Sequence, residues 1–151
     1  MTPQLSLFLR ISSVLTGFEV AELQATGMAE KYLSVVVQET PADTLGQFFK
    51  ESEAILQTGE GNPEAIGPLI ASNLFPATCF DGLAQNIVFM WYSGQWQPAL
   101  VVEESKSLQT AHNISPEAYI QGLVWSAANT HPPGAKQPGY GSWALPPLST
   151  R

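Results

Sequence analysis

Charged side chains are scarce in this sequence. They make up 13% of its 151 residues, about half the usual share of ~25%. A free monomer normally covers its surface with charge. A surface that is poor in charge and contains tryptophan is instead typical of one that a partner protein covers. The alternative is a neutral surface rich in Ser, Thr, Gln and Asn, and the chain has many of these residues. We favour the partner and keep the alternative open.

Basic residues are the scarcest charged class. The six Lys and Arg residues are scattered along the chain, and the net charge is −7. Nucleic acid is therefore not an expected ligand, and there is no basic patch for phosphates or anionic lipids. The acids end at Glu117, so the last part of the chain carries none.

Cysteine and long apolar runs are equally rare. The single cysteine, Cys79, excludes an internal disulfide and a cysteine-based zinc site, and its place in FPATCF favours a small buried hydrophobe. No apolar run approaches the ~20 residues that span a membrane, so we expect no direct membrane insertion. The first 18 residues lack an early positive cluster and a cleavage site, which favours a first helix over a signal peptide.

Motifs for chemistry are missing as well. The sequence contains neither GxGxxG nor GxxxxGK[ST], and the GYG at 139–141 runs into Ser-Trp rather than a helix start. The only histidines, His112 and His131, have no partner at metal-ligand spacing. The paired acids Glu51/Glu53 and Glu103/Glu104 are typical of solvated faces. We therefore expect no catalysis and no cofactor bound by this chain itself.

Helical periodicity dominates the first 128 residues. Apolar residues at steps of three and four predict a first helix that ends near Gly17, and a stripe of Met28, Tyr32 and Val36 predicts a second. Thr40 and Pro41 are typical of a helix start, and Gly94 of a helix end. The predicted helices span about 3–17, 20–38, 41–58, 68–75, 80–92 and 116–128, with a loop at 59–68 and a short strand or extended loop at 97–104.

The last 23 residues have a different composition. The stretch HPPGAKQPGYGSWALPP at 131–147 cannot be helical, because its prolines lack the backbone N–H. It carries aromatic side chains, which disordered tails usually lack. The sequence thus predicts an all-α fold: a single compact domain of about six helices over 1–128, and an extended Pro/Gly-rich arm over 129–151 that packs on the domain or on a partner.

Aromatic residues are the main candidates for function. WYSGQW at 91–96 contributes Trp91, Tyr92 and Trp96, the last predicted helix contributes Trp125, and the arm contributes Tyr140 and Trp143. Each tryptophan can bury a large area at an interface. Alternatively, these side chains form an internal cluster under the arm. Both arrangements stay open at this point.

Three stretches together resemble one protein family. They are LRISSVLTGF near the start, NIVFMWYSGQW in the middle and AYIQGLVWSAANTHPPGAKQPGYGSWALPP at the end. In this order they resemble the small subunit of bacterial FAD-dependent sugar and polyol dehydrogenases, which oxidise glucose, sorbitol or fructose. The resemblance covers most of the chain and is strongest over 84–96 and 119–147.

The resemblance implies a non-catalytic role. In that family the large subunit carries FAD and usually an iron–sulfur cluster, and a multihaem cytochrome c subunit accepts the electrons. The small subunit binds the large one, helps it to fold and commonly carries a twin-arginine export signal. This sequence shows no twin-arginine motif, so the periplasmic location that the resemblance implies and a cytoplasmic one both remain open.

We expect this chain to bind and stabilise an FAD-containing catalytic subunit. The predicted interface residues are Trp91, Tyr92, Trp96, Trp125, His131, Gly134, Gly139, Tyr140, Gly141 and Trp143. The glycines would allow turns or a close backbone approach that a Cβ forbids. The main alternative is a stand-alone, aromatic-lined module that binds a small carbohydrate. Two further alternatives are an enzyme that uses Glu and His groups in a cleft, and a chain that self-associates.

Overall fold

The computed structural model describes residues 2–97, 111–133 and 135, and in these ranges the fold is all-α, as predicted. The first helices are α1 (Pro3–Thr16), α2 (Val20–Ala25), α3 (Ala29–Glu39) and α4 (Ala42–Gly61). They are followed by the 3₁₀ turn η1 (Pro63–Ala65), α5 (Ile66–Asn73), a second 3₁₀ turn η2 (Phe80–Gly82) and α6 (Leu83–Ser93). A two-residue pair, β1 (Gln95–Trp96) and β2 (His112–Asn113), precedes α7 (Pro116–Gln121) and α8 (Leu123–Ala127).

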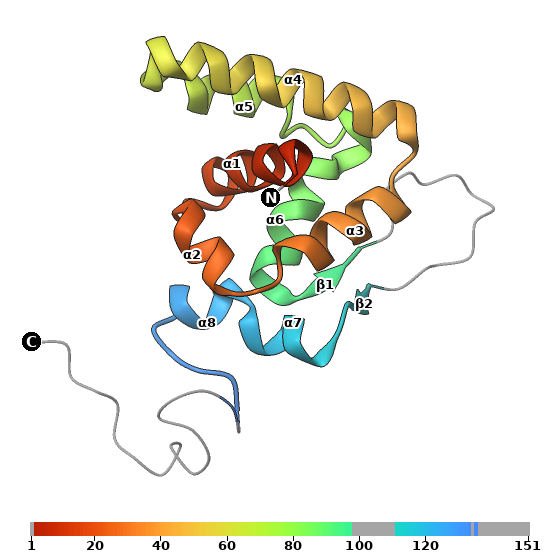
Figure 1. Cartoon of the computed structure of the whole chain (residues 1–151), viewed down its shortest axis with the longest axis vertical. Helices are drawn as coiled ribbons and strands as arrows, with labels where there is room; N and C mark the ends of the chain where they lie inside the picture. The colour runs from red at the N-terminus through yellow and green to blue at the C-terminus, as the bar shows by residue number, and fades with distance from the viewer. Residues whose placement is uncertain (1, 98–110, 134, 136–151) are drawn as a thin grey trace, which may run out of the picture.

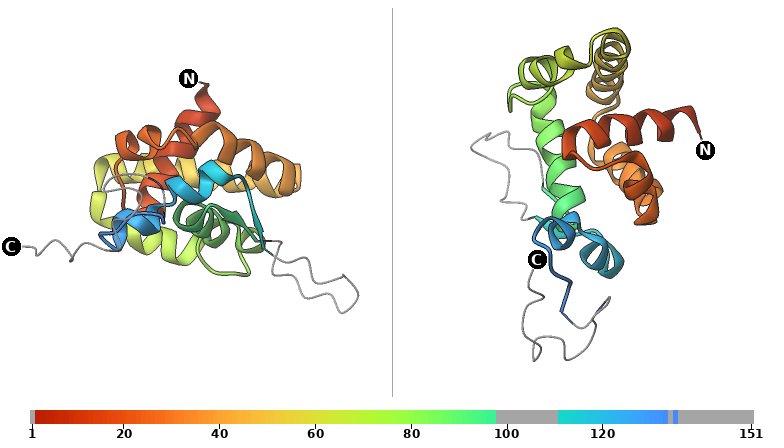
Figure 2. Two further views of the ribbon diagram at one scale, coloured as in Figure 1. Left: turned by 90° about the horizontal axis from the view of Figure 1, so that it is seen from below. Right: turned by 90° about the vertical axis from the view of Figure 1, so that its left-hand side faces the viewer.

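Helix α1 lies at the centre of the fold, in contact with α2, α3, α4 and α6 (Figure 1). Figure 2 shows α6 running from the α4–α5 end of the molecule to the end formed by α7 and α8. Its contacts with α1, β1 and α8 agree with this arrangement. Within the described ranges no helix is long and apolar enough to cross a membrane.

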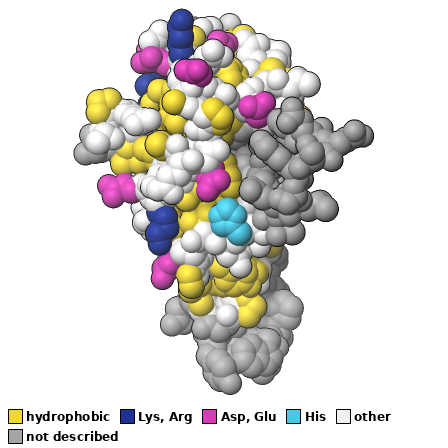
Figure 3. All heavy atoms as spheres, turned by 90° about the vertical axis from the view of Figure 1, so that its right-hand side faces the viewer, with side chains coloured by type: hydrophobic (Ala, Val, Ile, Leu, Met, Phe, Trp, Pro, Cys, Tyr) yellow, Lys and Arg dark blue, Asp and Glu magenta, His cyan; other side chains and the backbone are white. Residues whose placement is uncertain are grey.

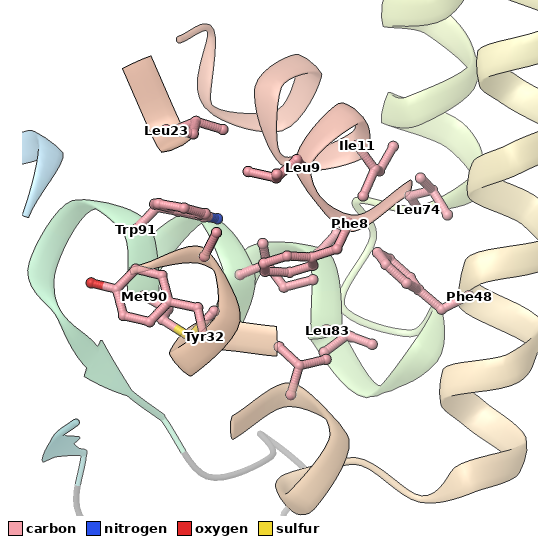
Figure 4. Close-up of a cluster of buried hydrophobic side chains, with 14 of the residues drawn as sticks. Phe8, Leu9, Ile11, Leu23, Tyr32, Phe48, Leu74, Leu83, Met90 and Trp91 are labelled. Atoms are coloured by element: carbon pink, nitrogen blue, oxygen red, sulfur yellow. The ribbon is translucent and has the colours of Figure 1, made fainter. Parts of the chain in front are cut away.

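The hydrophobic core lies where α1, α3, α4 and α6 meet (Figure 4). The largest fully buried side chains include Trp91, Tyr32, Phe8 and Phe48. Phe8 stacks on Trp91 with ring centroids 6.2 Å apart, and Phe48 meets Phe80 edge to face at 5.6 Å. The stripe of Met28, Tyr32 and Val36 that the sequence predicted is buried in this core.

The ends of α1 follow the sequence closely. The Thr2 hydroxyl accepts a hydrogen bond from the Leu5 backbone N–H at 3.2 Å, and Pro3 occupies the first helical position. Gly17 ends the helix in the left-handed conformation, with φ +79°. The prediction of a first helix that stops near Gly17 is confirmed.

The predicted single helix over 20–38 is wrong, because Gly27 interrupts it. Gly27 adopts φ +69° between α2 and α3, a conformation that glycine accommodates without strain. The Thr26 hydroxyl donates to the carbonyl of Leu23 and accepts from the N–H of Met28. These two bonds satisfy backbone groups that the break leaves without helical partners.

The predicted loop over 59–68 is mostly helical, which is a second correction. Helix α4 continues to Gly61, and α5 contains Pro68 as its third residue. A proline is tolerated there because the N–H groups of the first turn have no partner within the helix. Pro68 therefore does not delay the start of α5.

Helix α6 starts later than predicted but ends where predicted. Phe80, Asp81 and Gly82 all have positive φ, so a left-handed turn replaces the expected first helical turn. Gly94 then ends α6 with φ +72°. Residues 98–110, on which most of the predicted extended segment falls, lie outside the described residues.

The predicted helix over 116–128 is divided in two by Gly122. Its start is as expected, since the Ser115 hydroxyl accepts from the N–H of Ala118 at 3.2 Å and Pro116 is the first helical residue. Gly122, with ψ 133°, turns the chain out of the helical path, and α8 then runs as a separate short helix. This break determines how the candidate surface forms.

Candidate interaction surface

Trp91 belongs to the core of the chain. Its side chain has no solvent exposure, and the ring of Tyr32 meets it edge to face with centroids 4.8 Å apart. The chain in this fold therefore offers none of Trp91 to a partner. The sequence left open whether the aromatic residues form an interface or an internal cluster, and Trp91 belongs to an internal cluster. Its assignment to the predicted interface is therefore corrected.

Trp96 is also internal. It is buried in β1, where it pairs with His112 of β2. The next residue, Gln97, is bonded on both sides by the Asn86 amide: its carbonyl accepts from Asn86 Nδ2, and its N–H donates to Asn86 Oδ1 at 3.1 Å. The Asn86–Gln97 bonds thus join α6 to the end of β1. Because Trp96 is buried, its predicted interface role is corrected for the same reason as that of Trp91.

Tyr92 is half-buried and joins α6 to the end of α1. Its hydroxyl donates to the carbonyl of Thr16 at 3.1 Å, and its ring meets Phe18 edge to face at 6.0 Å. The residue remains partly accessible to solvent. Tyr92 therefore acts as a structural link, and its predicted contact with a partner stays a prediction.

Two glycines allow α7 and α8 to lie directly on the end of α6. A Cβ at Gly94 would overlap the backbone of Ala118, and a Cβ at Gly122 would lie 2.6 Å from the carbonyl oxygen of Tyr92. The close backbone approach predicted from the sequence involves other glycines, those of the arm. Gly134, Gly139 and Gly141 lie outside the described residues.

An aromatic surface forms where α7 meets α8, and we define it by Tyr119, Val124 and Trp125. The indole N–H of Trp125 donates to the carbonyl of Tyr119 at 2.8 Å, and the two rings meet edge to face at 5.3 Å. Tyr119 is 41% exposed and Val124 is 40% exposed. Figure 3 shows hydrophobic side chains gathered at this lower end of the molecule, where Figure 1 places α7 and α8.

The sequence singled out Trp125 but missed Tyr119 and Val124. On one continuous helix, residues six positions apart do not share a face. The turn at Gly122 brings Trp125 back over Tyr119, which no helical periodicity could indicate. The glycine in YIQGLVW was the only local signal for this break.

The described part of the arm begins directly beside this surface. The N–H of Thr130 donates to the carbonyl of Trp125 at 2.8 Å, so the arm leaves from the end of α8. His131 is half-buried, with Nδ1 lying 3.1 Å from the carbonyl oxygen of Pro132. The remaining predicted aromatic residues of the arm, Tyr140 and Trp143, lie outside the described residues.

Two open grooves border the helices. One, of about 370 Å³, lies between α1 and α3 and is lined by Leu5, Leu33 and Val37 among others. The second, of about 270 Å³, lies between α2 and the α7–α8 pair. Among the described residues, neither of these two grooves is lined by a Trp or Tyr side chain, and the second is lined by one aromatic ring, that of Phe18.

The described surface is strongly acidic. It carries eleven acids and three bases. Arg10 pairs with Glu60 at 3.2 Å, and Lys31 pairs with Glu117 at 3.5 Å. The backbone N–H of Glu117, the Ser115 hydroxyl and Lys31 together lower the pKa of the Glu117 carboxyl. Within the described ranges, no group of three or more His, Cys, Asp and Glu side chains could hold a metal ion.

Comparison of the chain with known protein families, with curated proteins and with solved structures finds no match. Function is therefore inferred from the residues themselves, from the resemblance of the three stretches, and from the geometry of α7 and α8.

Proposed function

We propose that this chain is a non-catalytic small subunit that binds and stabilises the FAD-containing catalytic subunit of a sugar or polyol dehydrogenase. The observation that carries the proposal is the aromatic surface of Tyr119, Val124 and Trp125. It lies at the point where the aromatic arm leaves the helical body. Exposed aromatic residues are typical of the centres of protein interfaces.

The arm and the aromatic surface can act on the same partner. An extended chain spans at most ~3.3–3.6 Å per residue, so the eight residues from Ala135 to Trp143 cannot span more than about 30 Å. One partner large enough to cover the α7–α8 end could therefore also be reached by Tyr140 and Trp143. This limit is compatible with one continuous interface.

The proposed mechanism is stabilisation by mass action. A subunit that binds the folded catalytic subunit, and not its unfolded chain, shifts the folding equilibrium toward the folded form. In this proposal FAD, any iron–sulfur cluster and the sugar are held by the partner, and electrons pass to a cytochrome c subunit where the complex has one. The residues of this chain supply contact area alone.

The test is co-expression of the tagged chain with a candidate FAD-containing catalytic subunit. The proposal expects the two chains to be recovered in equal amounts with the FAD absorbance, and soluble flavoprotein only when this chain is present. A colourless eluate and a flavoprotein that folds unaided would contradict it. Tryptophan fluorescence of the isolated chain on addition of sugars would then test the carbohydrate-binding alternative.

Trp143→Ala separates assembly from catalysis. We expect it to weaken the recovery of the complex and to leave the relative rates of the surviving complex with different sugars unchanged. Phe75→Ala is the control, because Phe75 is an exposed aromatic residue on the α5 side of the molecule. Normal assembly with an altered sugar preference would show that this chain contributes to the substrate site.

A further inference from the structure

The groove between α2 and the α7–α8 pair adjoins the aromatic surface. It combines apolar and polar side chains. Its apolar lining comes from Phe18, Ala25 and Leu123. Glu22, Gln121 and Ser126 supply polar groups. Ser126 directly follows Trp125 in α8, and Leu123 directly precedes Val124, so the groove is lined by chain neighbours of the aromatic surface.

Among the described residues that line the groove, Glu22 is the only one with a charged side chain. Its Oε2 accepts a hydrogen bond from the backbone N–H of Glu19 at 2.8 Å, and the Glu19 carboxylate accepts from the N–H of Glu22 in return. This reciprocal capping box fixes the Glu22 side chain at the start of α2. Its second oxygen, Oε1, has no hydrogen-bond partner among the described residues and remains available to a ligand.

Few bases of the described chain are available to neutralise Glu22. Of the three, Arg10 is paired with Glu60 and Lys31 with Glu117. Lys50 lies on α4, which Figure 1 places at the opposite end of the molecule from α7 and α8. The carboxylate in the groove therefore lacks a cation from the described residues.

A long basic side chain matches both properties of the groove. Lys and Arg pack their apolar stems along apolar surface and keep the charged head at a polar edge. A hydrogen bond between two ionised groups is about twice as strong as a neutral one. In this groove the stem would lie along Phe18, Ala25 and Leu123, and the head would reach Oε1 of Glu22.

We infer that the groove receives a Lys or Arg side chain of the catalytic subunit, and that Glu22 is its ion-pair partner. This inference rests on the proposed function, since it takes the occupant from that partner. The excess of acids on the described surface makes a basic counterpart on the partner the complementary arrangement. The groove would then fix the orientation of a partner that the aromatic surface holds.

The experiment compares Glu22→Gln with Glu19→Gln in the full-length chain. Glutamine retains an oxygen that can accept the hydrogen bond of the capping box, so each variant removes one charge and keeps α2 capped. Glu19 is exposed and lies outside the groove lining, which makes it a matched control. Binding to the purified flavoprotein is measured by titration at ~50 mM and ~300 mM salt, which differ in charge screening.

We expect Glu22→Gln to weaken binding about tenfold at the lower salt concentration and by less at the higher one, since salt screens the lost pair. Glu19→Gln should stay within about twofold of the wild type under both conditions. Equal effects of the two variants would overturn the inference and leave the proposed function standing. A wild-type chain that does not bind the flavoprotein would instead overturn the proposed function, and this inference with it.

Two other occupants have distinct signatures. If the groove takes Lys136 of the chain itself, Glu22→Gln should lower the melting temperature of the isolated chain more than Glu19→Gln does, with no specific loss of affinity for the flavoprotein. If it takes a second copy of the chain, Glu22→Gln should dissociate a wild-type dimer seen by sedimentation. Either result would overturn the assignment to the catalytic subunit.

Discussion

The phenol ring of Tyr32 meets the indole ring of Trp91 edge to face, with ring centroids 4.8 Å apart and planes at 87°. This geometry is the favoured one for an aromatic pair. Both side chains are buried, yet neither the Tyr32 hydroxyl nor the Trp91 indole N–H has a hydrogen-bond partner among the described residues. The contact therefore joins α3 to α6 through apolar packing alone, and it leaves two polar groups without the bonds that they make in water.

Tyr32→Phe should raise the free energy of unfolding by about 1 kcal/mol. The substitution keeps the ring against Trp91 and removes a buried hydroxyl whose desolvation is uncompensated. Tyr92→Phe is the matched control: it deletes a hydroxyl that donates to Thr16 and should lower the free energy of unfolding by about 1 kcal/mol. Urea denaturation measures both, and a loss of stability in Tyr32→Phe equal to that in Tyr92→Phe would contradict the prediction.

The Tyr32 hydroxyl also predicts a loss of stability at alkaline pH. Burial raises its pKa far above the ordinary value for tyrosine, so the folded chain keeps this proton while the unfolded chain releases it near pH ~10. The unfolded state then binds fewer protons, and stability falls as pH rises. The free energy of unfolding of the wild type should therefore fall, relative to that of Tyr32→Phe, by about 1.4 kcal/mol as the pH rises from ~9 to ~11.

Ser12→Ala provides the control for this pH dependence. It removes another buried hydroxyl that has no hydrogen-bond partner in the described part of the chain, but that group does not titrate in this range. Its effect on the free energy of unfolding should therefore be the same at both pH values. If the difference in free energy of unfolding between Tyr32→Phe and the wild type is the same at both pH values, Tyr32 does not cause a loss of stability at alkaline pH.

The sequence predicted the helices most reliably where periodicity and end signals agreed. Gly17, Gly94 and the Ser115-Pro116 start each mark a helix end or start in the structure. The errors are at residues whose effect depends on their position in the turn. Gly27 and Gly122 break predicted helices, whereas Pro68 is accommodated in the first turn of α5.

The candidate surface could be predicted only in part. Trp125 was identifiable as a large aromatic residue, but its contact with Tyr119 depends on the turn at Gly122. The burial of Trp91 and Trp96 depends on α1, α3 and β2, which are distant in sequence. A single sequence does not contain such long-range contacts, so aromatic residues of the core and of the surface could not be distinguished.

Gly94→Ala should destabilise the chain by more than about 2 kcal/mol. Gly94 has φ +72°, and an added Cβ would overlap the Ala118 backbone, so the side chain adds steric overlap to the cost of the left-handed conformation. Gly17→Ala is the control, since Gly17 has a similar φ of +79° with nothing within 4 Å of the added Cβ. It should cost about 1 kcal/mol. Equal losses in thermal or urea unfolding would show that α7 does not lie against the end of α6.

Val124→Asp tests the aromatic surface as the site of assembly. An aspartate would place a charge beside Tyr119 and Trp125, and burial of that charge under a partner costs free energy unless a cation pairs with it. We expect the recovered complex with the flavoprotein to fall at least tenfold, with little change in the melting temperature of the isolated chain, because Val124 is 40% exposed. Val37→Asp is the matched control: Val37 is 47% exposed and lines the other groove, between α1 and α3. Normal assembly in Val124→Asp together with a loss in Val37→Asp would place the partner on the α1–α3 face instead.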